Sequence, residues 1–112
     1  MDVQVQEHVI RVAVVAPRAR IDAFNAPTLR GRLDELLERG VNRFVLDLSQ
    51  VPFLDSAGMA VLVSLLKRAR NAEGDVQLVW PSEEAARRIL RLTKFDKVFV
   101  MVETAEAALK SF

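Results

Sequence analysis

Strand-like and helix-like segments alternate along nearly the whole chain, and this alternation restricts the possible folds more than any other feature of the sequence. Apolar, β-rich segments occupy 3–17, 43–49, 76–80 and 97–102. Segments with apolar residues at helical spacing occupy 19–40, 56–70, 82–93 and 103–112. Strands that alternate with helices predict βαβ units around a largely parallel sheet.

The first β-rich segment is long enough for two strands. Val3 and Val5 alternate with glutamines, whereas the residues from Val12 onward are continuously apolar, which indicates an edge strand followed by a more buried one. With a tight turn near Glu7 and His8, the expected order is β-β-α-β-α-β-α-β-α. Residues 1–112 are therefore expected to form one α/β domain, with a mixed, mostly parallel sheet of about five strands and about four helices. The polar alternation of the first strand favours a protected edge and a monomer.

The ends of the first helix carry their own signals. Four leucines beginning at Leu29 lie at i, i+4, i+7 and i+8, an amphipathic stripe. Asn25 or Ala26 is expected to cap this helix, with Pro27 in the first turn, where the missing N–H costs nothing. Gly40 follows the last turn as a stop signal.

Composition excludes several functions. Sixteen Lys and Arg against fifteen Asp and Glu give a net charge of +1, too little for the concentrated basic face that nucleic acid binding needs. The arginines at 30, 32, 39 and 43, and those at 87, 88 and 91, are interpreted as solvated surface, because two of the groups fall on predicted helices.

The absence of cysteine excludes disulfides and thiol chemistry. The N-terminus lacks the apolar core of a secretory signal, and no apolar run approaches the roughly 18 residues of a membrane span, so a cytoplasmic protein without a membrane partner is expected.

The joint "PFLDSAGMA" at 52–60 places polar residues between a predicted strand and a predicted helix. In open α/β sheets, ligand and partner sites lie at this edge. One interpretation is structural: the Ser56 hydroxyl caps the helix while Asp55 adds negative charge at its positive end, and loss of the cap would cost about 1 kcal/mol. Ser82 is expected to cap the third helix in the same way. The other interpretation is that the joint is a functional site.

Most catalytic sites can be excluded at this joint. A nucleophilic serine needs a base, and the sole histidine, His8, is expected to be an exposed turn residue of the first hairpin. The joint lacks the glycines and lysine of a phosphate-binding loop, and the first parallel strand lacks the acidic pair of a phosphoaspartate receiver. Asp22, Asp47 and Asp55 are too few for a metal site. We therefore expect neither an enzyme nor a bound metal or cofactor. The remaining function for Ser56 is modification by another protein, because its small neighbours leave room for a kinase to approach. Phosphorylation would add roughly −1.5 to −2 charge beside Asp55.

At this point the chain resembles the STAS domain family, and within it the stand-alone anti-sigma factor antagonists of bacteria. The segment "VLDLSQVPFLDSAGMAVLV" (45–63) is similar to the family pattern of apolar strand, Asp-Ser-x-Gly and apolar helix, and "RIDAFNAPTLRGRL" (20–33) is similar to its Asp-containing loop. The chain departs from the family at Ala19, where glycine is common. At Ala57 it lacks a second hydroxyl, which leaves Ser56 as the motif's only acceptor.

The resemblance implies a switch. In the family, an anti-sigma factor that is itself a serine kinase phosphorylates the serine after the Asp, here Ser56, and a serine phosphatase restores it. The unphosphorylated protein binds the anti-sigma factor and thereby releases a sigma factor for transcription. By the same resemblance the partner-binding residues are Asp22, Asp55, Ser56, Ala57, Gly58 and Met59.

Two alternatives stay open at this stage. The chain could be a STAS subunit of a lipid-trafficking or signalling complex in which Ser56 is only a cap. It could instead be a nucleotide-binding sensor, since some family members bind purine nucleotides near this loop.

Overall fold

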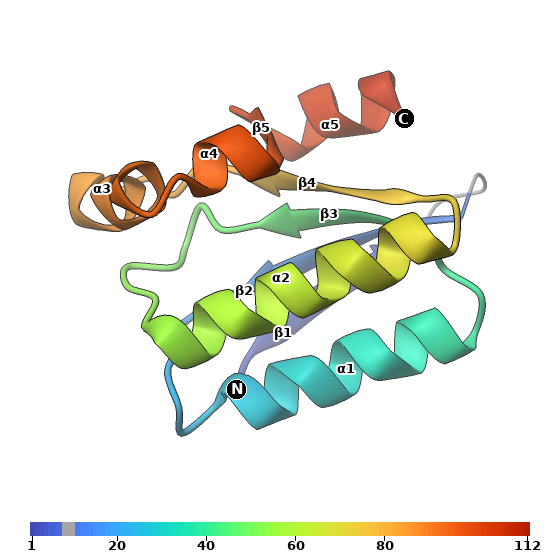
Figure 1. Cartoon of the computed structure of the whole chain (residues 1–112), viewed down its shortest axis with the longest axis horizontal. Helices are drawn as coiled ribbons and strands as arrows, with labels where there is room; N and C mark the ends of the chain where they lie inside the picture. Colours follow the sequence, from blue (N-terminus) through green and yellow to red (C-terminus); the bar gives the residue numbers. More distant parts are fainter. Residues whose placement is uncertain (8–10) are drawn as a thin grey trace.

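The computed structural model describes residues 1–7 and 11–112. In this part of the chain, five strands form one sheet in the order β1-β2-β3-β4-β5 (Figure 1). The strands are β1 (Val3–Glu7), β2 (Val12–Pro17), β3 (Arg43–Asp47), β4 (Asp75–Val79) and β5 (Val100–Val102). β1 pairs with β2 antiparallel and the other three pairs are parallel, which confirms the predicted mixed, mostly parallel sheet. The turn expected near Glu7 and His8 falls on residues outside the described part.

Helices cover both faces of this sheet. They are α1 (Ala26–Glu38), α2 (Ser56–Asn71), α3 (Glu84–Leu92), α4 (Phe95–Val98) and α5 (Ala105–Ser111). α1 and α2 lie side by side on one face, and α5 packs on the other (Figure 1). The alternation of side chains along β2 explains this arrangement: Ala13 and Val15 belong to the larger core beneath α1 and α2, whereas Val12 and Val14 belong to the smaller core beneath α5.

Both ends of α1 lie where the sequence predicts them. Pro27 lies in the first turn after Asn25, which is the N-cap residue although its side chain makes no cap hydrogen bond. Gly40 adopts φ +87°, the left-handed conformation expected just beyond a helix end. The arginines at 30, 32 and 39 on this side of the molecule are exposed, as expected for a solvated face.

The segment after β4 differs from the prediction in two ways. The strand predicted at 97–102 is only β5, at 100–102, because the preceding residues form α4, a fifth helix. One helical turn brings Phe95 and Phe99 together with their ring centroids 5.4 Å apart, and Phe99 is buried in the larger core. Of the three valines in the predicted strand, Val98 and Val100 are instead exposed.

The prediction that Ser82 caps α3 was wrong. α3 begins at Glu84, and its N-cap residue is Glu83, whose side chain makes no cap hydrogen bond. The Ser82 backbone N–H instead donates to the Ser49 carbonyl at 3.2 Å, so this segment is tied to the loop after β3. Ser82 therefore lies one residue before the N-cap position of α3.

Candidate functional site

Two loops meet at the edge where the parallel strands β2 and β3 end. Ile21, in the loop before α1, donates its N–H to the Phe53 carbonyl at 2.9 Å, and Asp55 donates its N–H to the Ile21 carbonyl at 3.1 Å. Ile21 and Leu54 form an isolated parallel bridge and are both buried. The two segments that carried the family resemblance, far apart in sequence, are therefore bound directly to each other.

Asp55 holds this junction together. It is the N-cap residue of α2, and its Oδ1 accepts hydrogen bonds from the N–H groups of Ala57 at 2.9 Å and Gly58 at 3.1 Å. Its Oδ2 accepts from the Ala23 N–H in the other loop at 3.0 Å. These bonds, the one from Gly58 foremost, lower the pKa of Asp55, helped by the charge of Arg20 and opposed by partial burial. The ionised carboxylate thus joins the start of α2 to the loop before α1.

The structural interpretation, in which the Ser56 hydroxyl caps α2, is wrong. It is the first residue of α2, its side chain is exposed, and its hydroxyl makes no hydrogen bond to any residue that the structure describes. Because Asp55 already accepts the first-turn N–H groups, the helix start does not need the Ser56 hydroxyl.

Asp22 shapes the neighbouring loop rather than contacting Asp55. Its Oδ1 accepts from the N–H groups of Phe24 at 3.0 Å and Asn25 at 3.2 Å, and its Oδ2 lies 3.1 Å from Nε of Arg20. The Asp22 carbonyl accepts from the Ala26 N–H at 2.8 Å, which leads directly into α1. Each of the two aspartates therefore fixes one of the two loops at this edge.

The other three predicted partner residues differ in exposure. Gly58 is buried, and a Cβ added there would lie 2.8 Å from Cγ2 and 3.0 Å from the carbonyl oxygen of Ile21. Only glycine allows this close approach of the loop to α2, so the role that the structure gives Gly58 is spacing. Ala57 and Met59 are half-buried and pack against the larger core, leaving part of each side chain at the surface.

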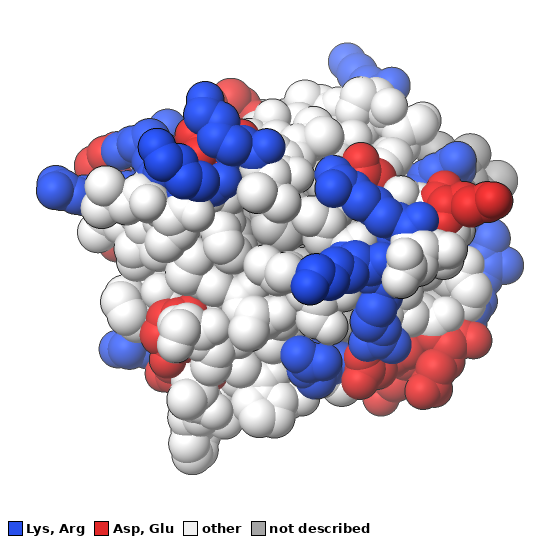
Figure 2. Space-filling model, viewed as in Figure 1, with Lys and Arg blue, Asp and Glu red and all other residues white. Residues whose placement is uncertain are grey.

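Two aromatic residues that the sequence interpretation did not single out lie at the same edge. Phe24 is 94% exposed and Phe53 is 38% exposed, with the Arg20 guanidinium 4.8 Å from the Phe53 ring centroid. The available signal was that Phe24 lies in a polar turn, outside the leucine stripe of α1. Figure 2 shows that the surface over the start of α1 is uncharged, while a small group of acidic and basic side chains lies over the start of α2.

An open groove of about 310 Å³ lies between the starts of α1 and α2. It is lined by Ala23, Ala26, Pro27, Arg30, Ala57, Ala60 and Val61. Small apolar side chains dominate this lining, so the groove could receive apolar groups of a ligand or partner. Its residues flank Ser56 on the α2 side and Phe24 on the α1 side.

The metal-ligand candidates are dispersed. Asp47 ends β3 and accepts the Ser49 N–H at 3.0 Å, while Asp22 and Asp55 are engaged as described above. Within residues 1–7 and 11–112, no group of three or more His, Cys, Asp or Glu side chains is placed to hold a metal ion. Among the same residues, no helix has both the length and the apolar character to cross a membrane. His8 lies outside the described residues.

Comparison with known proteins defines the class. Residues 1–108 match the family model of the STAS domain, so the chain belongs to the STAS domain family. A Bacillus subtilis anti-sigma-B factor antagonist is 32% identical over 92 residues, covering 82% of this chain and 77% of the relative. A Thermotoga maritima protein provisionally named an anti-sigma factor antagonist is 31% identical over 100 residues, 88% of each chain.

A solved structure agrees with these sequence comparisons. The crystal structure of an anti-sigma factor antagonist from Mycobacterium paratuberculosis superposes with a TM-score of 0.86 and 30% identity, covering 98% of this chain and 92% of that one. The predicted single STAS-like fold and the resemblance to anti-sigma factor antagonists are both confirmed.

Proposed function

We propose that the protein is an anti-sigma factor antagonist that binds an anti-sigma factor kinase while Ser56 is unphosphorylated and is switched off by phosphorylation of Ser56. The observation that carries the proposal is that Ser56 is exposed at the start of α2 while Asp55 does the capping. A kinase can therefore modify the hydroxyl without dismantling a structural hydrogen bond. The relatives named as anti-sigma factor antagonists support the same role.

The surroundings of Ser56 explain how a phosphate would act as a switch. A phosphoserine carries roughly −1.5 to −2 charge at neutral pH. Here that charge would stand beside the ionised Asp55, whose Oδ1 already accepts the N–H groups of Ala57 and Gly58. The helix dipole favours an anion at this end, so the fold is expected to survive, but a partner surface fitted to apolar neighbours would reject the dianion.

The partner surface in this proposal consists of the exposed parts of Asp22, Asp55, Ser56, Ala57 and Met59, with Gly58 acting through its spacing. Binding would sequester the anti-sigma factor and release a sigma factor, and a serine phosphatase would reverse the modification. The protein itself would contact neither nucleic acid nor membrane and would act as a regulator rather than as an enzyme.

The test is phosphorylation by an anti-sigma factor kinase encoded in the same genome. With ATP, we expect mass spectrometry to find one phosphate on Ser56 of the wild type, none on Ser56→Ala, and the wild-type extent on the matched control Ser82→Ala, which removes a second exposed serine. In calorimetry, Ser56→Ala should bind the kinase even with ATP present, and Ser56→Asp should bind poorly.

Two results would contradict the switch. One is unchanged kinase affinity in both Ser56 variants. The other is kinase binding that leaves no phosphate on Ser56 even after incubation with ATP, which would favour a STAS subunit of another complex.

A further inference from the structure

Phe24 is an exposed aromatic side chain on a firmly held loop. Its own N–H donates to Oδ1 of Asp22 at 3.0 Å, and the Ala23 N–H before it donates to Oδ2 of Asp55 at 3.0 Å. The side chain is 94% exposed, so it contributes little to the core. Aromatic side chains presented on pre-organised backbone dominate the energetics of many protein interfaces, because little conformational entropy is lost on binding.

A second groove continues from the first along the outer face of α2. It has a volume of about 460 Å³ and is lined by Ala60, Val63, Ser64, Lys67 and Arg68. Ala60 lines both grooves, which makes them one surface. We call Phe24 together with the residues lining the two grooves the docking face.

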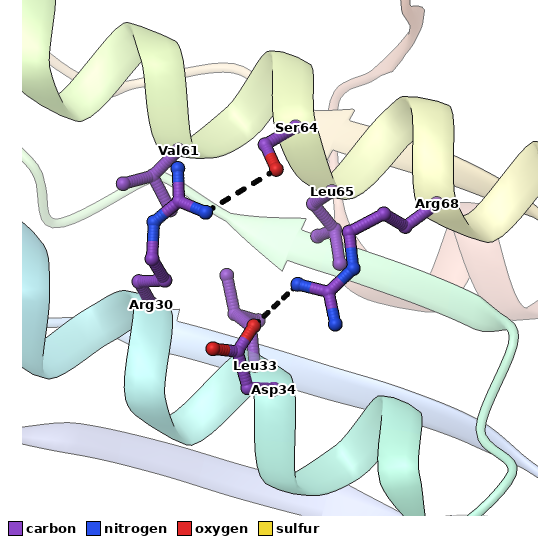
Figure 3. Close-up of a pocket in the computed structure, with 7 residues that line it drawn as sticks. All are labelled: Arg30, Leu33, Asp34, Val61, Ser64, Leu65 and Arg68. Carbon is purple, nitrogen blue, oxygen red and sulfur yellow. Dashed lines mark hydrogen bonds and ion pairs between the residues drawn. The ribbon is translucent and has the colours of Figure 1, made fainter.

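The docking face changes in character along its length. The groove nearer Ser56 is lined mainly by small apolar side chains, and in Figure 2 lysines and arginines gather over the second half of α2. Figure 3 shows Arg30 reaching from α1 to Ser64 on α2, with Nη1 to Oγ at 3.4 Å, and Arg68 paired with Asp34 across the same seam. Lys67 forms no ion pair with any described residue. From Ala57 to Lys67 the helix rises about 15 Å at 1.5 Å per residue.

This polarity defines the partner. We propose that the kinase partner docks along α2 with an apolar pocket over Phe24 and with carboxylates opposite Lys67, which lies about 15 Å along the helix from Ala57. The inference rests on the proposed function and adds the chemistry of the partner surface. Lys67 supplies the charge complementarity, and Phe24 is the anchor residue.

The same geometry places the switch at the Phe24 end of the docking face. Asp55 joins the Phe24 loop to the start of α2 through its bonds to Ala23, Ala57 and Gly58. Ser56 therefore lies at the apolar end of the docking face. A phosphate there would have to be buried against the apolar part of the partner, at a high desolvation cost.

The experiment measures the affinity of the anti-sigma factor kinase for the unphosphorylated chain by calorimetry. Phe24→Ala should weaken binding roughly 30-fold, the loss typical of an interface hot spot. Phe24→Leu should recover part of that loss. The matched control is Leu92→Ala on α3, which removes an apolar side chain that is 69% exposed, and it should leave affinity unchanged.

The charged end is tested by Lys67→Glu. We expect affinity to fall about three- to tenfold at low salt and the difference to shrink as salt screens the pair. Lys97→Glu on α4, another exposed lysine reversed, is the control that should bind as the wild type does.

The outcomes separate the two proposals. If the wild type binds the kinase and neither Phe24→Ala nor Lys67→Glu weakens binding beyond its control, the docking face is overturned while the Ser56 switch stands. If the wild type neither binds nor is phosphorylated, the proposed function fails and the docking face fails with it. Because Phe24 is so exposed, circular dichroism of Phe24→Ala should show unchanged folding.

Discussion

The starts of α2 and α3 are similar in sequence and different in structure. Each places a serine next to an acidic residue after a buried strand: Asp55-Ser56 at α2 and Ser82-Glu83 at α3. At α2 the acid accepts three backbone hydrogen bonds, one of them from a loop 32 residues away. At α3 the N-cap side chain accepts none. The same residue types therefore make a cross-linked junction in one place and a plain helix start in the other.

The difference lies in what each start can pack against. α2 begins where Ile21 pairs with Leu54, so a second loop supplies an N–H to the Asp55 carboxylate. At α3 the Glu83 side chain makes no cap hydrogen bond. The segment is held by the Ser82 N–H bond to the Ser49 carbonyl and by a bond from Nε of Arg87 to the Pro81 carbonyl at 2.7 Å. The junction at α2 leaves the Ser56 hydroxyl exposed at the start of a helix whose first turn is already capped by Asp55.

Among the substitutions that test this comparison, Gly58→Ala is expected to lower the stability of the fold most. The new Cβ would lie 2.8 Å from Cγ2 of Ile21, so the loop must move or the helix must shift. We expect the free energy of unfolding to fall by about 1–3 kcal/mol, the usual cost of overpacking, measured by urea denaturation.

Gly31→Ala in α1 is the matched control. It is also a helical glycine, but no heavy atom lies within 4 Å of its added Cβ. This substitution should stabilise the protein by up to about 1 kcal/mol through helix propensity. If Gly58→Ala were equally stabilising, the close contact between the loop and α2 would not exist in solution.

Asp55→Asn is expected to have the next largest effect on the stability of the fold. Asparagine keeps an acceptor for Ala57 and Gly58 but turns an NH2 group toward the Ala23 N–H, so two donors face each other. We expect lower stability and faster hydrogen exchange at the Ala23 amide. The control is Glu83→Gln at α3, where no cap hydrogen bond exists to be lost, and it should leave stability unchanged.

The pH dependence sharpens this test. The pKa of folded Asp55 lies below its ordinary value of 3.8, so the ionised carboxylate stabilises the fold above that pH and the contribution disappears as pH falls through the folded pKa. The stability difference between wild type and Asp55→Asn should be full at neutral pH and should shrink below pH 3.8. A difference that stays constant to low pH would mean that the carboxylate charge is not what holds the junction.

The smallest effects are expected from Ser56→Ala and Ser82→Ala. Both side chains are exposed and neither caps its helix, so each change should alter the unfolding free energy by less than about 0.5 kcal/mol. A loss of about 1 kcal/mol in Ser56→Ala alone would indicate that its hydroxyl caps α2 in solution.

Local sequence predicted much of the fold because periodicity and stop signals act over a few residues. The leucine stripe from Leu29 and the stop at Gly40 gave α1 its face and its end. The prediction failed after β4, where the apolar run at 97–102 reads as a strand but the stacking of Phe95 on Phe99 favours a helical turn. The contact itself spans one helical turn, but it also buries Phe99 in the larger core, and the local pattern does not contain that core.

The sequence by itself determined the sheet, the helices around it other than α4, and the position of Asp55 and Ser56 at the joint between β3 and α2. Only the tertiary structure decided which of the two caps the helix, because the choice depends on the Ala23 N–H that another loop brings to Asp55. It likewise decided that Gly58 is a spacer against Ile21 and that Phe24 points to solvent. The Asp55 cap and the Gly58 spacing depend on contacts between residues more than 30 positions apart, so they arise only when the chain has folded.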